Sequence, residues 1–478
     1  MPQHLVLFRH PTGQVMAVLR TFVLPPIFVL TLLLALSRPA GAYSVLTHEE
    51  IVDLTWSDSI QPLLLSRFPH LTALQLQEAH AYAYGGCVIQ DLGYYPFGKP
   101  IFSDLLHYVR TGDFIRALFR DSKDANDVAF AIGALSHFLG DTIGHPDAIN
   151  IAVGKEFPEL AAKYGPNVNY AEGPHQHVRA EFAFDVNDIG KHRLAPERYL
   201  NRIGFAVPIP LLTRAFYDTY GLDLAKVLGH DHPKLRGYRF SVRSLLPRVA
   251  YAEDMLYRKR MPPDVPSPEL DAFNQEIAKL SAANHWDTYH HRGPRIGTHL
   301  LAFFIFIIPK PGVLSDLSLH PPSASAEQDY VSSLMHTVSV MRKTLGNATR
   351  SDGLPNLDLD TGREVAPGTY SLEDYTYVDL LHRMTSDPSQ PVPFGIKKDL
   401  IAYFSDLNQV KYIRNDRTRL AQVNADLPVL RNISTRAAYP ETAFLPQPDE
   451  DKPPEAKGQP TSNAPEPATS PANTKSPQ

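Results

Sequence analysis

The sequence predicts a predominantly helical protein, and two kinds of signal lead to this expectation. Apolar side chains recur at helical spacing over long segments, most clearly between Asp124 and Thr142. A helix-start signal is present as well, because Thr47 and Glu50 form a Thr-x-x-Glu capping box. Internal repeats and glycine-rich phosphate-binding loops are absent from the sequence. We therefore expect helices that pack on one another.

Length and composition indicate an ordinary globular protein. The chain has 478 residues, of which 43% are apolar and 20% charged, so one large or two medium domains are expected. Its 46 basic and 51 acidic residues give a net charge of -5, which argues against a nucleic-acid binder that relies on positive charge. There are 20 histidines but only Cys87, so an intrachain disulfide is excluded and metal ligation by nitrogen and oxygen is favoured.

The N-terminus has the pattern of an export signal. Arg20 precedes an apolar run, and Ala40-Gly41-Ala42 is a small-residue cleavage site. We therefore predict a signal peptide at 1–42, cleavage before Tyr43 and a secreted or periplasmic protein. Initiation at Met16 would give the charged region a more usual length. The alternative interpretation is an uncleaved membrane anchor.

The predicted mature chain opens with possible metal donors. Cleavage would expose the α-amine of Tyr43, which can chelate a metal together with its own carbonyl. The capping box then starts a helix near Thr47, and His48 in its first turn would be a third donor. Taken alone, such an N-terminal segment is more often a disordered tail.

The region from 60 to about 110 contains two further candidate ligands. Residues 60–90 are expected to be helical, and Pro96 and Gly98 predict a loop after Asp91. A helix is expected to resume near Ser103 and to carry His107. Asp91 is either a local helix cap or a metal ligand.

The helix expected from Asp124 to Thr142 carries the most informative pattern. His137, Asp141 and His145 are spaced four residues apart, which places their side chains along one helix face. Two imidazoles and a carboxylate suit a divalent metal, zinc above all. Gly144 and Pro146 are expected to end this helix, so that His145 sits just past its regular face. The alternative is a helix with satisfied core histidines.

A second pair of the same kind favours the metal interpretation. After a loop to about Pro174, His177 and Glu181 are again four residues apart in the next predicted helix. His175 is a competing ligand in this helix.

The rest of the chain is expected to be helical up to a polar tail. The run Leu300 to Pro309 is too short to span a bilayer, so burial is expected, with contact to lipid as the alternative. From Pro446 the composition predicts a disordered tail. Helices are expected around 207–220, 240–260, 268–284, 326–345, 371–386 and 397–411.

The candidate ligands, in this order and at these spacings, resemble those of the zinc-dependent phospholipase C family. That family is related to the single-strand-specific zinc nucleases and to the N-terminal domain of glycosylphosphatidylinositol-specific phospholipase D. The similarity covers about residues 43–190. It rests on the series His48, Asp91, His107, His137, Asp141, His145, His177 and Glu181. The chain departs from the family where Tyr43 replaces the usual Trp and where His145 follows Asp141 more closely than usual.

The resemblance implies an all-α, multi-helix zinc phospholipase C-like domain. The residues beyond it predict additional C-terminal helices and a disordered tail. The resemblance also implies up to three zinc ions, with Asp91 as the candidate general base or water-orienting residue. The implied ligands are Asp91, His107, His137 and Asp141 for one ion, His145, His177 and Glu181 for the second, and the Tyr43 backbone, His48 and a bridging Asp141 for the third. Together with the residue patterns described above, the resemblance predicts a signal peptide at 1–42, a catalytic domain at 43–310 with the resemblance strongest at 43–190, a helical C-terminal extension at 311–445 and a disordered Pro-rich tail at 446–478.

The implied activity is that of a secreted or periplasmic phosphodiesterase of phospholipase C type, which hydrolyses phospholipid head-group esters with metal-activated water. The expected partners are a phospholipid or other phosphodiester substrate and a transiently contacted membrane surface, without a stable nucleic-acid partner. One alternative is a nuclease or a glycosylphosphatidylinositol-directed phospholipase on the same site. The other is a non-catalytic helical protein that binds metal.

Overall fold

The computed structural model describes residues 44–95, 98–229, 242, 246–257, 261–290, 298–299, 302, 321–346 and 353–436. The predicted signal peptide, Tyr43 and the predicted disordered tail lie outside the described residues, as does most of the apolar run from 300 to 309. None of the helices described is long and apolar enough to cross a bilayer.

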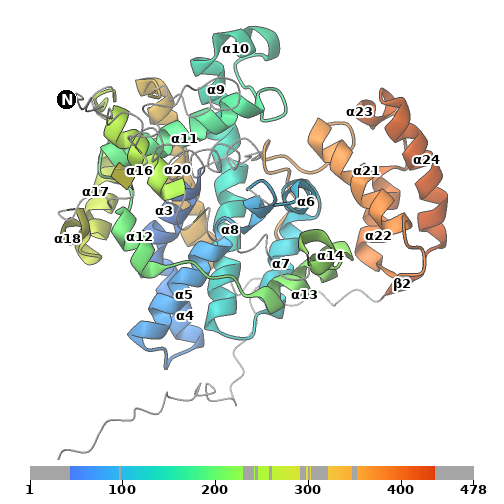
Figure 1. The fold of residues 1–478 in the computed structure, drawn as a ribbon, viewed down its shortest axis with the longest axis horizontal. Coiled ribbons are helices and arrows are strands. Elements are labelled where there is room, and N and C mark those ends of the chain that lie inside the picture. Colours follow the sequence, from blue (N-terminus) through green and yellow to red (C-terminus); the bar gives the residue numbers. More distant parts are fainter. Residues whose placement is uncertain are drawn as a thin grey trace, which may run out of the picture.

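The described residues form an all-α fold, which confirms the predicted fold class (Figure 1). The N-terminal elements are α3 (Val45–Thr55), η2 (Trp56–Ile60), α4 (Gln61–Arg67), α5 (Ala73–Gly86), η3 (Ile89–Gly93), α6 (Pro100–Tyr108), α7 (Thr111–Asp121), α8 (Ala125–Gly144), η4 (His145–Ile149), α9 (Asn150–Glu156), α10 (Pro158–Tyr164) and α11 (Pro174–Gly190). The central elements are α12 (Glu197–Ile203), α13 (Ile209–Tyr220), α14 (Leu224–Leu228), α16 (Leu246–Tyr257), α17 (Pro268–Ala283), α18 (Trp286–His290) and α20 (Ala324–Gly346). The C-terminal elements are α21 (Ser371–Thr385), β1 (Val392–Pro393), α22 (Phe394–Tyr403), α23 (Lys411–Arg414), α24 (Arg417–Asn432) and β2 (Thr435–Arg436). β1 and β2 form one short parallel pair, in which Val392 lies opposite Thr435.

Helix α8 lies at the centre of the molecule and is buried along most of its length (Figure 1). It packs closely on α5 because each helix presents a glycine to the other. A Cβ atom at Gly133 of α8 would lie 2.0 Å from the carbonyl oxygen of Ala83, and one at Gly86 of α5 would lie 2.0 Å from that of Phe130. Only a residue without a side chain permits this approach.

Several local predictions differ from the structure. The predicted loop to about Pro174 contains α9 and α10. The first helix begins at Val45 rather than near Thr47, because the Thr47 hydroxyl donates to Asp185 Oδ1 (2.7 Å) instead of capping. The predicted helix from 60 to 90 is interrupted before Ala73, where Thr72 and Gln75 form a capping box. Pro146 does not end the helical path, since the chain continues through a π-helical turn, η4, into α9. Such a turn accommodates the missing proline N–H and is frequent at functional sites.

The C-terminal helices share one core with the N-terminal ones. One large hydrophobic cluster contains buried residues from Val45 of α3 to Ile433 after α24. Helix α20 packs on α3 and α8, whereas α21 to α24 form a group beside α6, on the right of Figure 1. Between α20 and α21, residues 353–370 approach α6 and the α8–η4 junction, so this segment reaches the region of the candidate ligands.

Candidate metal centre

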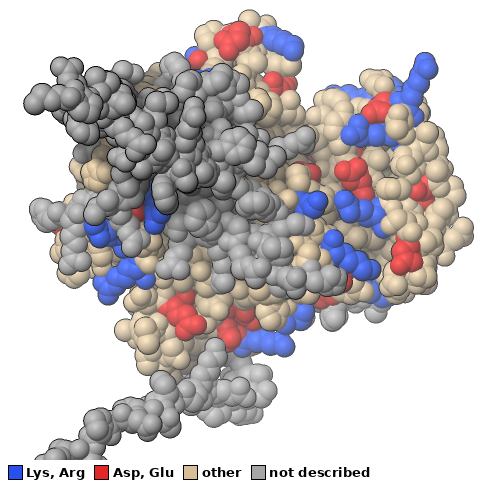
Figure 2. Space-filling view, viewed as in Figure 1, with Lys and Arg blue, Asp and Glu red and all other residues tan. Residues whose placement is uncertain are grey.

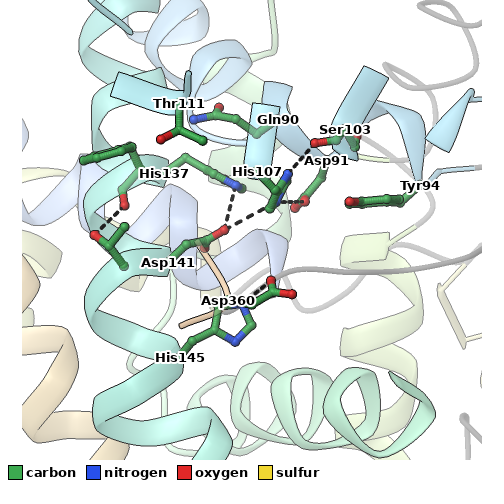
Figure 3. A network of polar contacts seen from close by, with 12 residues as sticks. Gln90, Asp91, Tyr94, Ser103, His107, Thr111, His137, Asp141, His145 and Asp360 are labelled. Atoms are coloured by element: carbon green, nitrogen blue, oxygen red, sulfur yellow. Dashed lines mark hydrogen bonds and ion pairs between the residues drawn. The ribbon is translucent and has the colours of Figure 1, made fainter. Parts of the chain in front are cut away.

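Asp141 of α8 lies where three imidazoles converge, as Figure 3 shows in part. Its Oδ2 atom is 3.0 Å from His137 Nε2 and 3.5 Å from His107 Nε2. Its Oδ1 atom is 3.3 Å from His48 Nε2, which reaches the site from α3. Asp91, in η3, places Oδ1 3.4 Å from His107 Nε2.

These residues form two overlapping groups with the spacing of metal ligands. In each group the ligand-type atoms lie within 4.8 Å of one another, and all the residues are buried. The groups are His48, His137 and Asp141, and Asp91, His107 and His137. Imidazole nitrogens and carboxylate oxygens together suit zinc, so the arrangement could hold at least one ion.

The second predicted set lies beside the first in a looser arrangement. His145, at the start of η4, and His177 of α11 have ring centroids 5.7 Å apart. His177 Nδ1 is 3.8 Å from Glu181 Oε1. His145 Nε2 is 3.5 Å from Oδ1 of Asp360, a residue that the sequence analysis did not select (Figure 3).

Backbone carbonyls fix the orientation of three of the imidazoles. His137 Nδ1 donates to the carbonyl of Cys87 (2.9 Å), and His107 Nδ1 donates to that of Ser103 (2.8 Å). His177 Nε2 donates to the carbonyl of Val168 (2.6 Å). In each case the other nitrogen faces the site. This is how metal-binding histidines are usually held.

The atoms that face the site lack hydrogen-bond partners among the described residues, although they are fully buried. A buried polar atom without a partner costs about 1–3 kcal/mol, so a whole group of them requires an explanation. A divalent cation would satisfy nitrogen lone pairs and carboxylate oxygens together, and the residues present therefore fit zinc. The atoms are Asp91 Oδ1, His107 Nε2, His137 Nε2, both carboxylate oxygens of Asp141, both ring nitrogens of His145, His177 Nδ1, Glu181 Oε1 and Asp360 Oδ1.

The electrostatics of the site agree with this explanation. Burial lowers the pKa of His145 to about 4 and the pKa of His177 to about 3, so both imidazoles are neutral, and therefore able to ligate a metal, at pH 7. Burial opposes the charge of Asp141, but His137 and the other imidazoles hold the pKa of this carboxyl well below its usual range. Burial, followed by the nearby Asp91 and Asp141, raises the pKa of Glu181 well above its usual range. A cation would relieve this crowding of carboxylates.

The structure therefore brings together every predicted side-chain ligand from His48 to Glu181, in the two sets just described. Tyr43, the predicted backbone ligand, lies outside the described residues. Of the competing histidines in α11, His177 is buried in the site and His175 is exposed. Asp360 is the residue that sequence reasoning missed. Its only signal is an Asp-Leu-Asp run between prolines and glycines, and such runs are common in loops without any metal.

The fold and the buried histidine and carboxylate side chains are those of an all-α protein with a candidate metal centre. Comparison with protein families identifies the class more closely. Residues 47–229 match the family described as zinc dependent phospholipase C. The resemblance noted in the sequence is thus confirmed. Neither the search of curated proteins nor that of solved structures gave a match.

Proposed function

We propose that this protein is a zinc-dependent phosphodiesterase of phospholipase C type, which hydrolyses phospholipid head-group esters. One observation carries the proposal. Helices from the segment that matches the family bring buried, unpartnered imidazole nitrogens and carboxylate oxygens into one site. The match to the family supports chemistry on phosphoric esters, and the donor set supports the metal on which that chemistry depends.

The residues of the site would hold up to three zinc ions. The proposed sets are Asp91, His107, His137 and Asp141; His145, His177 and Glu181; and His48 with Asp141 and the backbone of Tyr43. When bound, zinc lowers the pKa of water towards neutrality and withdraws charge from phosphoryl oxygens. The carboxylates of Asp91, Asp141 and Glu181 offset the positive charge that the site must accept.

Asp91 is the proposed general base or water-orienting residue. It is 3% exposed, and its Oδ1 atom faces His107 without a hydrogen-bond partner in the described part of the chain. A carboxylate held in this way can accept a proton from water or fix the position of a water molecule.

Export and membrane contact are part of the same proposal. The pattern of residues 1–42 supports secretion or periplasmic location after cleavage, with 43–310 as the catalytic domain and 311–445 as its helical extension. A phospholipid substrate implies transient contact with a membrane surface. On the face shown in Figure 2, basic and acidic side chains are interspersed over the C-terminal helices, which favours lipid over an extended polyanion as substrate.

The decisive experiment combines metal analysis with two assays. Purified mature protein is expected to contain zinc and to release the phosphorylated head group from phosphatidylcholine vesicles. The variant Asp91→Asn should lose at least about a hundredfold in kcat while it keeps its melting temperature. N-terminal sequencing should find Tyr43 as the first residue.

Each negative result has a distinct meaning. Absence of zinc would contradict the metal centre, and intact Ala42–Tyr43 would contradict cleavage. Cleavage of single-stranded DNA without lipid hydrolysis would replace the phospholipase with a nuclease. Cleavage of glycosylphosphatidylinositol alone would restrict the substrate to that anchor. Zinc without any of these activities would indicate a structural metal site.

A further inference from the structure

Asp360 enters the candidate metal centre from a segment far beyond the part of the chain that matches the family. It lies in a tight turn in which Leu357 and Glu364 form an antiparallel bridge. The turn is closed by Asp358, whose Oδ1 atom accepts from the backbone N–H of Thr361 (2.9 Å) and from its hydroxyl (3.1 Å). The position of Asp360 is therefore set by local backbone geometry.

The turn is attached to the elements that carry the predicted ligands. The backbone N–H of Leu359 donates to the carbonyl of His107 (3.0 Å), so α6 holds both this turn and a ligand. The side-chain amide of Asn150, directly after η4, donates to the carbonyl of Asp360 (3.1 Å). The backbone on either side of the Asp360 carboxylate is thus fixed relative to the site.

The two oxygens of the Asp360 carboxylate have different surroundings. Oδ2 accepts hydrogen bonds from the hydroxyls of Tyr108 (2.9 Å) and Tyr370 (2.5 Å). Oδ1 has no hydrogen-bond partner among the described residues and lies 3.5 Å from His145 Nε2. Asp360 is 1% exposed, so water does not solvate the second oxygen freely. Figure 3 shows this carboxylate between Asp141 and His145.

We propose that Asp360 is a further ligand of the metal ion held by His145, His177 and Glu181. This inference rests on the proposed zinc-dependent function. A cation beside Oδ1 and His145 satisfies two buried atoms that otherwise lack partners. Tyr108 and Tyr370 would then orient the carboxylate through their hydrogen bonds to Oδ2, as partners of metal ligands usually do.

The consequence is that the metal centre is built from two separate parts of the chain. The ligands predicted from sequence lie at or before Glu181, whereas Asp360 lies in the segment between α20 and α21. The added carboxylate also gives the second ion a charged donor beyond Glu181, which strengthens binding of a divalent cation.

The test is zinc binding by the full mature chain. Zinc content after dialysis and zinc affinity in competition with a chelator are measured for wild type, Asp360→Asn and the matched control Asp358→Asn. The control changes a buried carboxylate of the same turn but retains an oxygen that can accept from Thr361. We expect Asp360→Asn to weaken the binding of one zinc ion by at least about tenfold. Asp358→Asn should bind zinc like wild type.

A measurement on wild type covers the case in which Asp360→Asn does not fold. Hydrogen exchange is compared with and without zinc, and peptides from residues 353–370 should gain protection along with those that contain His145 and His177. Protection confined to the N-terminal ligands, or equal zinc affinity of wild type and Asp360→Asn, would overturn this inference and leave the proposed function standing. If wild type binds no zinc, the proposed function itself fails together with this inference. If Asp358→Asn weakens binding as much as Asp360→Asn, the effect belongs to the turn, and the direct ligand role is wrong.

Discussion

Asp141 lies close to all three imidazoles of the first set. Each of its oxygens faces imidazole nitrogens, His48 on one side and His107 and His137 on the other. A carboxylate can bridge two cations in this position because both of its oxygens carry negative charge, whereas an amide has a single neutral oxygen.

We predict that Asp141→Asn lowers zinc affinity by more than about a hundredfold and abolishes turnover. Zinc content and kcat of the purified variant provide the measurement. The control is Asp147→Asn, because Asp147 is exposed in η4 and pairs only with the exposed His336 (3.3 Å) in the described structure. Full zinc content in Asp141→Asn would show that this carboxylate is not a ligand.

At the scale of single residues, spacing in the sequence was informative wherever one helix carries two ligands. The pairs His137 with Asp141 and His177 with Glu181 are recognisable because a four-residue interval places both on one face. Asp360 has no such partner nearby in the sequence. Its position follows from a turn and from contacts with distant helices, which no local pattern records.

At the scale of helices, the contact between α5 and α8 supports the first set of ligands. Cys87, which follows α5, supplies the carbonyl that orients His137 of α8 (2.9 Å). The close approach at Gly133 and Gly86 therefore controls both packing and the orientation of a candidate ligand.

We predict that Gly133→Ala destabilises the protein by about 1–3 kcal/mol, because the new methyl group overlaps the Ala83 carbonyl. In an open helix the same change would stabilise by up to about 1 kcal/mol, so the direction of the effect reports the clash. Urea unfolding measures the difference. Gly346→Ala, at the end of α20 with open space around it, serves as control and should not destabilise. Equal effects of the two substitutions would refute the close contact.

The contact between α21 and α22 contains a pH-dependent element. The Tyr403 hydroxyl lies 2.9 Å from Glu373 Oε1 and 2.5 Å from Asp374 Oδ1. Burial, opposed by the hydrogen bond from Tyr403 and assisted by the neighbouring Asp374, raises the pKa of Glu373 to about 8. Glu373 is therefore protonated in the folded protein at pH values at which it is ionised in the unfolded chain.

Between its ordinary pKa of 4.5 and its folded-state pKa of about 8, Glu373 carries a proton in the folded protein but not in the unfolded chain. The folded protein therefore becomes less stable as the pH rises through this range. We predict that Glu373→Gln is less sensitive to pH in this window and more stable than wild type at pH 8. Melting temperatures across the window test this. Glu364→Gln, an exposed change, should follow wild type, and a Glu373→Gln curve parallel to wild type would contradict the assignment.

Helices were predicted correctly where apolar side chains recur at helical spacing over a long segment. They were predicted incorrectly where tertiary contacts determine the backbone conformation. Helix α8 was predicted almost to its ends, with Asp124 as the residue that caps its start. The continuation past Pro146 was not predicted, because a π-helical turn differs from a helix end only in its backbone geometry. Helix α24 was also missed, since its apolar positions are few and Pro428 interrupts the pattern.

At the scale of the whole molecule, α20 joins the predicted extension to the rest of the protein. It packs on α3 and α8, and its Tyr330 stacks on Phe184 of α11 with ring centroids 4.5 Å apart. The buried Glu327 accepts from Lys191 and from Arg193 (2.8 Å), just after α11. These contacts connect residues on both sides of the predicted boundary at 310.

We predict that a chain ending at residue 310 does not fold on its own, because the loss of α20 exposes apolar faces of α3 and α8. Its buried residues include Val331, Leu334, Val338 and Met341, and burial of each such side chain stabilises by about 1.5–3 kcal/mol. Circular dichroism and thermal unfolding of the truncated protein are the measurements. A chain ending at residue 436 keeps every described element and should melt like wild type. Cooperative unfolding of the shorter chain would show instead that 43–310 is an independent domain.

The bond between the Leu359 backbone and the His107 carbonyl also bears on the order of events during synthesis. On the ribosome, the residues of the His–Asp cluster are made well before α20 and the turn that contains Asp360. Because the fold depends on α20, the complete donor set would form only after both have been synthesised. A zinc ion bound earlier would be held by an unfolded chain and would exchange readily.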